Sequence, residues 1–141
     1  MRKKVASFIS ALAIMVTGIL TVYAVGVCVA VTSLRISTGS TLTGSKYSMP
    51  YNTQSIEFDW TEIGYTNSSD PYMNVTLYKK GLIFYSSYQT NKLTVKAGTP
   101  SSTLTYSNAG SGSYYWYFET GTSAKPTGYF SANPVYINSE S

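Results

Sequence analysis

The 141-residue chain is predicted to fold as an all-β protein: an antiparallel two-sheet sandwich of seven to eight strands, preceded by an N-terminal hydrophobic helix. Three observations predict this class. Apolar and polar residues alternate with a period of two along much of the chain after residue 40. Stretches rich in Gly, Asn, Ser and Pro, which favour turns, separate these alternating segments. No segment after residue 34 has the apolar spacing of an amphipathic helix.

The first 34 residues differ from the rest of the chain. Basic residues 2–4 are followed by a stretch without charge that continues to Leu34, a pattern typical of a secretory signal peptide. Small residues offer a cleavage position after Ala24, which we prefer, or after Ala30. The stretch also exceeds the ~20 residues of a membrane-spanning helix, so an uncleaved anchor with a cytoplasmic N-terminus is the alternative. We assign residues 1–30 to a signal peptide or membrane anchor, 31–40 to a linker, 41–138 to the sandwich and 139–141 to a tail.

Cysteine usage is consistent with export. Cys28 is the single cysteine of the chain, and the valine before it stands where a lipoprotein motif requires a small residue, which disfavours lipid modification. The body therefore has no disulfide and must be stabilised by its core, as a domain of this size can be. We expect an extracellular or cell-surface protein of a Gram-positive-like bacterium.

The strands are predicted in order from their alternation and from the turns between them. A first strand is expected near residues 41–47. In "SIEFDWTEI", residues 55–63, the side chains of Ile56, Phe58 and Trp60 face inward and the acidic residues between them face solvent. Five more alternating segments and the aromatic run follow, at residues 73–81 with Val75 and Leu77 inward, 82–90, 92–98, 102–107, 112–121 and 128–137.

The segment "GSYYWYFETG", residues 112–121, contains five consecutive aromatic side chains. A strand alternates, so they cannot share one face. We expect Tyr114, Trp116 and Phe118 to face inward, because burying Trp and Phe removes more apolar area for each hydroxyl that then needs a partner. Tyr115 and Tyr117 then face outward.

The stretch "SGSYYWYF", a glycine-serine corner followed by a tyrosine two residues before a large inward residue, resembles the tyrosine corner of immunoglobulin-like and fibronectin-type-III-like sandwiches. The resemblance spans about residues 40 to 138 at the level of strand order. It implies such a sandwich, with Trp60 and Trp116 as the aromatic centre of the core. The cysteine pair of antibody domains is absent, and so broad a fold implies no functional residue.

Charge and chemistry exclude several functions. The net charge of +4 arises largely at residues 2–4, and the remainder has seven basic against six acidic side chains, which disfavours a nucleic-acid partner. The chain has no histidine, and no cysteine follows Cys28. Thiol nucleophiles, His-assisted triads and His or Cys zinc sites are therefore excluded in the body.

Two weaker chemical patterns have simpler interpretations. Glu57 and Asp59 share one strand face at a separation of ~7 Å, within the range of inverting glycosidases, but alternating acids are usually the solvated face of a strand. The "NSSDP" segment offers oxygen ligands without the spacing of a calcium loop, so it predicts a turn. We expect no enzymatic activity, no catalytic residue, no metal and no cofactor.

A tyrosine surface is the candidate binding site. Four tyrosines fall on outward positions of their strands: Tyr78, Tyr115, Tyr117 and Tyr136. We expect them side by side in one sheet, with Tyr85 or Tyr88 near its edge. Such a surface suits binding of a protein or a glycan, while the alternative is that cross-strand tyrosine pairs only stabilise the sheet.

The sequence therefore predicts a binding or adhesion module whose ligand is a protein or a cell-wall glycan. A protein ligand is favoured because both tryptophans, the strongest sugar-stacking side chains, are assigned to the core. The alternative is a structural protein that assembles through edge-strand pairing. A secreted toxin or bacteriocin ranks lower, since no membrane-active helix follows Leu34. Membrane contact is expected only through residues 5–34, if they are uncleaved.

Overall fold

The computed structural model describes residues 7–8, 26–37, 39–65, 71–122 and 128–141, which form strands and the turns between them. In this part of the chain no helix is long and apolar enough to cross a membrane. Three expected features lie wholly or mostly outside the described residues: the N-terminal hydrophobic helix, the cleavage position after Ala24, and the "NSSDP" turn.

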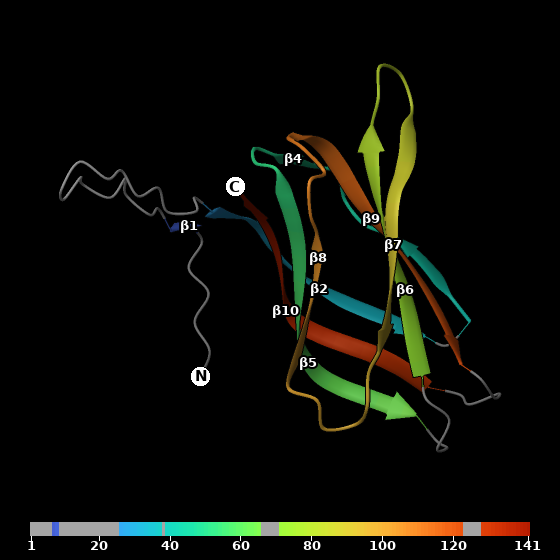
Figure 1. The fold of residues 1–141 in the computed structure, drawn as a ribbon. Helices are drawn as coiled ribbons and strands as arrows, with labels where there is room; N and C mark the ends of the chain where they lie inside the picture. Colours follow the sequence, from blue (N-terminus) through green and yellow to red (C-terminus); the bar gives the residue numbers. More distant parts are fainter. Residues whose placement is uncertain (1–6, 9–25, 38, 66–70, 123–127) are drawn as a thin grey trace.

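The described strands form two antiparallel sheets that face each other (Figure 1). The first sheet has the order β1 (Ser7–Phe8), β2 (Gly26–Ser37), β10 (Gly128–Glu140), β5 (Thr53–Tyr65) and β8 (Ser101–Tyr106). The second sheet has the order β3 (Thr41–Thr43), β9 (Gly112–Thr122), β6 (Pro71–Lys80) and β7 (Tyr85–Thr94), and β4 (Tyr47–Met49) also pairs with β9.

The strand pairs are nested around one turn. β6 pairs with β7, β5 with β8, β3 and β4 with β9, and β2 with β10. The chain is thus one long antiparallel ribbon, folded back at residues 81–84, whose successive strand pairs fall alternately in the two sheets. This wrapping of a ribbon into two sheets is that of a jelly roll.

The predicted two-sheet sandwich is confirmed, but its immunoglobulin-like type is not. In that type, consecutive strands pair repeatedly within each sheet, in the orders ABED and CFG. Here most ladders of the described residues join strands that are far apart in sequence, such as β2 and β10. The tyrosine corner could not reveal this difference, because it is a local motif and the ladder partners are not local.

Strand β2 covers residues that the sequence placed in a targeting segment and a linker. It runs from Gly26 to Ser37 and pairs along most of its length with β10. Valine and other β-branched residues suit a strand, and a short apolar run does not by itself distinguish a buried strand from a helix. The described sandwich therefore begins before residue 41, and it extends to Glu140.

Strand β7 also departs from the prediction. The strands expected at residues 82–90 and 92–98 are one strand, Tyr85–Thr94, and residues 82–84 lie in the turn before it. The polar "QTN" sequence at residues 89–91 has the composition of a turn, but it lies within β7, the last strand of its sheet. An edge strand tolerates polar side chains on both faces because both are exposed to solvent.

The inward phase of the aromatic run is confirmed. Tyr114, Trp116 and Phe118 are buried between the sheets, as are Val75 and Leu77 of β6. In the second sheet the predicted alternation therefore holds on two neighbouring strands, β6 and β9.

The two tryptophans do not share the core equally. Trp116 is 1% exposed, whereas Trp60 is only partly buried. The Trp60 ring stacks on Phe58 at a centroid distance of 5.0 Å, and its indole N–H donates to Ser102 Oγ at 2.9 Å. Phe58 in turn meets Phe118 of the opposite sheet at 6.3 Å. Trp116 is thus in the predicted core and Trp60 is at its margin.

The corner before β9 is closed by hydrogen bonds from a tyrosine hydroxyl. The Tyr114 hydroxyl lies 2.6 Å from the Ala109 carbonyl and 2.5 Å from the Gly110 carbonyl, so its single hydrogen is shared between them. Gly110 has a φ of +81°, which a side chain would disfavour. Gln54 Nε2 donates to the same Gly110 carbonyl at 2.9 Å. These bonds hold the corner against the core.

Candidate functional site

Four tyrosines meet on the outer face of the second sheet, and we call Tyr78, Tyr85, Tyr115 and Tyr117 the tyrosine cluster. The β6–β9 register places Tyr78 directly opposite Tyr115. Their rings are stacked with centroids 4.9 Å apart and an interplanar angle of 4°. Tyr117 meets the Tyr78 ring edge-on at 6.1 Å, and Tyr85 lies 5.0 Å from Tyr115. Strands β6, β7 and β9 therefore contribute to one aromatic surface.

Polar contacts fix the edge of the tyrosine cluster. The Tyr85 hydroxyl is hydrogen-bonded to Ser113 Oγ at 2.8 Å, which ties β7 to β9 across the intervening β6. The Lys46 ammonium lies 5.0 Å from the centre of the Tyr85 ring, within the distance of a cation–π interaction. The cluster rings remain partly exposed. Because these contacts hold the rings in place, a partner could bind the tyrosine cluster without reordering it.

The Tyr115 hydroxyl is held in its neutral form by its surroundings. The pKa of Tyr115 is raised above its ordinary value of 10.0, first by desolvation and then by the hydroxyls of Tyr78 and Tyr85. A neutral phenol both donates and accepts a hydrogen bond. The cluster therefore offers apolar ring area together with hydroxyl groups, of which that of Tyr115 is neutral.

Tyr136 is not part of this surface. It lies on β10 in the first sheet, opposite Val31 and Glu57, and it is 8% exposed. Its outward phase was predicted from alternation, but the sheet to which β10 belongs depends on long-range pairing. The expectation that Tyr136 would lie beside Tyr78 was therefore wrong.

Of the two tyrosines expected near the edge, Tyr85 joins the cluster. Tyr88 lies on β7 too, and its hydroxyl donates to the Ser107 carbonyl at 2.7 Å, which links the edges of the two sheets. A register irregularity between Leu77 and Tyr78 shifts the pairing of β6 with β7 close to this position. Sequence alternation alone did not indicate that irregularity.

The acidic pair lies in a different environment from the one expected. Glu57 is only 5% exposed, so the interpretation of this strand face as solvated was wrong at that residue. β5 lies between β10 and β8, which places Tyr136 and Thr103 directly beside Glu57, and Thr103 Oγ1 donates to Glu57 Oε2 at 3.4 Å. No set of three or more His, Cys, Asp or Glu that could hold a metal occurs within the described ranges.

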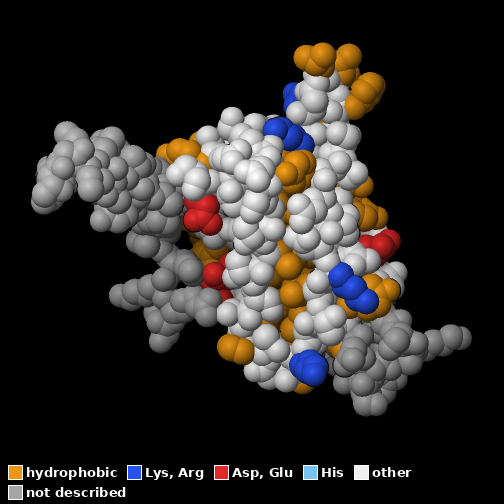
Figure 2. Space-filling view, in the orientation of Figure 1, with side chains coloured by type: hydrophobic (Ala, Val, Ile, Leu, Met, Phe, Trp, Pro, Cys, Tyr) orange, Lys and Arg blue, Asp and Glu red, His pale blue; other side chains and the backbone are white. Residues whose placement is uncertain are grey.

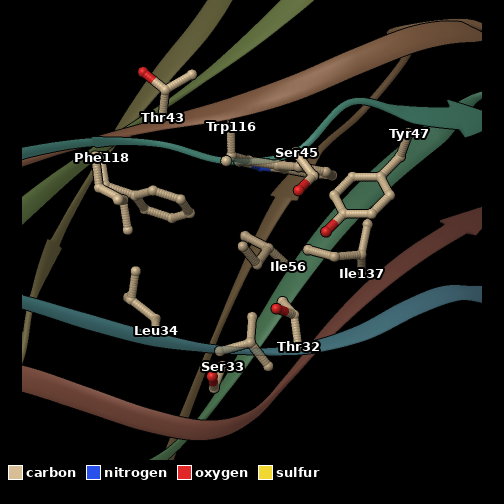
Figure 3. Close-up of a pocket in the computed structure, with 13 residues that line it drawn as sticks. Thr32, Ser33, Leu34, Thr43, Ser45, Tyr47, Ile56, Trp116, Phe118 and Ile137 are labelled. Atoms are coloured by element: carbon tan, nitrogen blue, oxygen red, sulfur yellow. The ribbon is translucent and has the colours of Figure 1, made fainter.

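A small cavity opens between the sheets, near β2 and the segment that joins β3 to β4 (Figure 3). Its volume is about 200 Å³, below the ~300–1,000 Å³ of typical small-molecule sites. Apolar side chains such as Ile56, Trp116 and Phe118 line it, with Thr43 and Ser45 beside them. The cavity is therefore a weaker candidate than the tyrosine cluster.

Comparisons with known proteins find distant structural similarity. No protein-family model and no curated protein matches the chain. Among solved structures, the chain is similar to that of the infectious bursal disease virus Gx strain, with a TM-score of 0.45 and 11% identity over 93% of this chain and 38% of the other. It is also similar to the infectious bursal disease virus VP2 subviral particle, with a TM-score of 0.44 and 11% identity over 93% and 37%. The chain thus spans well under half the length of these structures.

Proposed function

We propose that this protein is an exported, non-catalytic binding or adhesion module that acts outside a Gram-positive-like bacterium, either secreted or at the cell surface. Its contact surface is the tyrosine cluster. The observation that carries this proposal is the convergence of four partly exposed tyrosine rings from three strands on one sheet face. Tyrosine gives large contact area at low conformational cost, and it is enriched where binding energy concentrates.

The ligand is proposed to be a protein rather than a glycan. Sugar stacking is strongest on tryptophan, yet Trp116 is buried and the indole N–H of Trp60 already donates to Ser102. The cluster instead combines tyrosine hydroxyls with the Lys46 ammonium at its edge. This combination suits a partner surface that offers carbonyl groups and carboxylates.

Site-specific photo-crosslinking tests this proposal and its choice of ligand. A benzophenone-bearing phenylalanine would replace Tyr78 in the full-length protein, and the variant would be illuminated on bacterial cells. The matched control carries the same group in place of Tyr129, which is on β10 in the first sheet. A crosslinked protein at position 78 that is absent at position 129 supports the proposal. Equal crosslinking at both positions, or none at either, contradicts it.

Self-assembly is the second candidate, and one observation favours it. β7 is a ten-residue edge strand with β6 on one side and no ladder partner on the other among the described residues. Such an edge can pair with a neighbouring molecule. Sedimentation velocity tests this: assembly that disappears in Gln89→Lys, which adds a charge to the edge, supports pairing through β7. A monomer at all concentrations excludes it.

A further inference from the structure

Three large apolar side chains are highly exposed at the end of the β6–β7 hairpin. Leu82, Ile83 and Phe84, which we call the apolar tip, are 101%, 75% and 79% exposed. The hairpin extends beyond the rest of the sandwich (Figure 1), and Figure 2 shows the apolar tip as a hydrophobic cap at its end. Exposing a run of apolar side chains to water is unfavourable, so such runs often mark a site of interaction.

The turn itself is ordered. Lys80 pairs with Tyr85 at the last position of the ladder, and the Gly81 N–H donates to the Phe84 carbonyl at 2.7 Å. The tip residues therefore lie in a closed turn between two long strands. The sandwich holds these side chains away from its own core instead of folding them back onto it.

The surroundings of the apolar tip are basic. Lys80 precedes the turn and is exposed, and Lys46 lies over the Tyr85 ring at the start of β7. Lys79 lies further back, where its ammonium is 2.5 Å from the Ala109 carbonyl. The segments that form this end of the second sheet, residues 44–52, 78–88 and 106–117, contain no Asp or Glu. Within these segments, every charged side chain near the tip is therefore a lysine.

We propose that the apolar tip inserts into an anionic lipid bilayer. The acyl chains of a bilayer can contact three adjacent side chains on all sides of a convex turn. A protein partner would need a concave pocket that matches the whole tip. Lys46 and Lys80 would then lie level with the lipid phosphates, each contributing attraction to a negative surface. Tyr85 would lie at the interface, where tyrosine is enriched in membrane proteins.

This inference goes beyond the proposed function and rests on the apolar tip, which is not part of the tyrosine cluster, although Lys46 and Tyr85 contribute to both surfaces. It also differs from the sequence-based expectation that membrane contact would be limited to residues 5–34. The tyrosine cluster could bind its partner whether or not the tip enters a membrane. A failure of one proposal therefore leaves the other standing, provided that the test reports on the tip alone.

A tryptophan placed in the tip provides such a local report. Full-length Phe84→Trp would be mixed with vesicles of equal parts phosphatidylcholine and phosphatidylglycerol, and the wild-type spectrum would be subtracted. We expect a blue shift of the added tryptophan and quenching by brominated acyl chains. The matched control is Tyr129→Trp, on the first sheet, which should show neither. Because both proteins keep residues 1–34, any membrane binding by that segment is common to them.

The lysines supply the second arm of the test. In the Phe84→Trp background, the double change Lys46→Gln and Lys80→Gln should lower the affinity for these vesicles at low salt by about tenfold or more. Each lysine near an anionic surface contributes on the order of fivefold to the affinity. Vesicles of phosphatidylcholine alone should likewise give a weaker response. An unshifted, unquenched Trp at position 84 would overturn the proposal, as would equal quenching at position 129. A response independent of lipid charge would overturn its electrostatic part.

Discussion

The rings of Tyr78 and Tyr115 lie parallel across the β6–β9 ladder, with centroids 4.9 Å apart. Because the two residues are register partners, the stacking follows directly from strand pairing. A double-mutant cycle with Tyr78→Ala and Tyr115→Ala should give a coupling free energy of about 0.5 to 1.5 kcal/mol. Urea unfolding of the four proteins measures it. Strictly additive losses would mean that the two rings do not interact in solution.

The burial of Trp116 predicts a much larger loss than any in the tyrosine cluster. Trp116→Ala should destabilise the fold by about 3 to 5 kcal/mol, which is a large part of the ~5 to 15 kcal/mol stability of a typical domain. Trp60→Ala should cost less, because Trp60 is only partly buried. Tyr115→Ala serves as the exposed comparison on the same strand. Comparable losses for Tyr115→Ala and Trp116→Ala in urea melts would show that the strand phase is reversed.

The corner before β9 should weaken when one hydroxyl is removed. Tyr114→Phe keeps the ring but leaves the carbonyls of Ala109 and Gly110 without this donor. The expected loss is about 0.5 to 1.5 kcal/mol, together with faster amide exchange in residues 107–112. Tyr117→Phe, whose hydroxyl belongs to the exposed face, is the control. Equal effects of the two changes would argue against the corner hydrogen bonds.

Alkaline pH should destabilise the fold through its tyrosines. Desolvation by burial raises the pKa of Tyr106 above the ordinary 10.0, opposed in part by the neighbouring side chains of Asn91 and Trp116, and the pKa of Tyr115 is also raised. The folded state then holds these protons more tightly than the unfolded chain does. The free energy of unfolding should be unaffected by these groups below pH 10 and should fall as the pH rises above it.

The control for this pH dependence is Tyr106→Phe. This variant loses the hydrogen bond from the Tyr106 hydroxyl to the Val75 carbonyl, at 2.6 Å, and should be less stable at neutral pH. It also loses the ionisable group, so its stability should fall less steeply above pH 10. Urea midpoints measured across the alkaline range decide the matter. Parallel curves for wild type and variant would exclude Tyr106 as a source of the pH dependence.

The pairing of β2 leads us to expect the first of the two cleavage positions. Cleavage after Ala30 would remove the residues that pair with Ile137–Glu140 at the end of β10, whereas cleavage after Ala24 would leave β2 whole. We therefore expect the mature protein to begin at Val25. Mass spectrometry of culture fluid and membrane fractions measures this. A chain beginning at Val31 would contradict the expectation, and an intact chain confined to membranes would indicate an anchor.

Local features of this fold could be predicted and long-range ones could not. The inward phase of Tyr114, Trp116 and Phe118 follows from alternation within one strand, and the structure confirms it. The jelly-roll order depends on ladders such as β2–β10, whose partners, from Ser37 with Tyr129 to Gly26 with Glu140, lie far apart in the sequence. Nothing in the spacing of neighbouring residues encodes such a pairing.

The same distinction explains the mixed outcome at the candidate site. Tyr78, Tyr115 and Tyr117 were correctly placed together because β6 and β9 are paired. Tyr136 was misplaced because β10 belongs to the other sheet. The apolar tip was missed because "LIF" after Gly81 has the composition of a strand, and only the closing Lys80–Tyr85 pair shows that these residues form the turn.

Retention on bacterial envelopes tests the contact surface most directly. Equal amounts of full-length wild type, the Tyr115→Ser, Tyr117→Ser double variant and the Tyr129→Ser control would be incubated with washed Gram-positive cells and with cell-wall material. The retained fraction would be measured after confirming by circular dichroism that all three are folded. We predict that the double variant loses retention by about tenfold or more, as loss of central contact tyrosines does, while Tyr129→Ser binds like wild type. Unchanged retention of the folded double variant would contradict the account and would leave the tyrosine cluster as a stabiliser of its sheet.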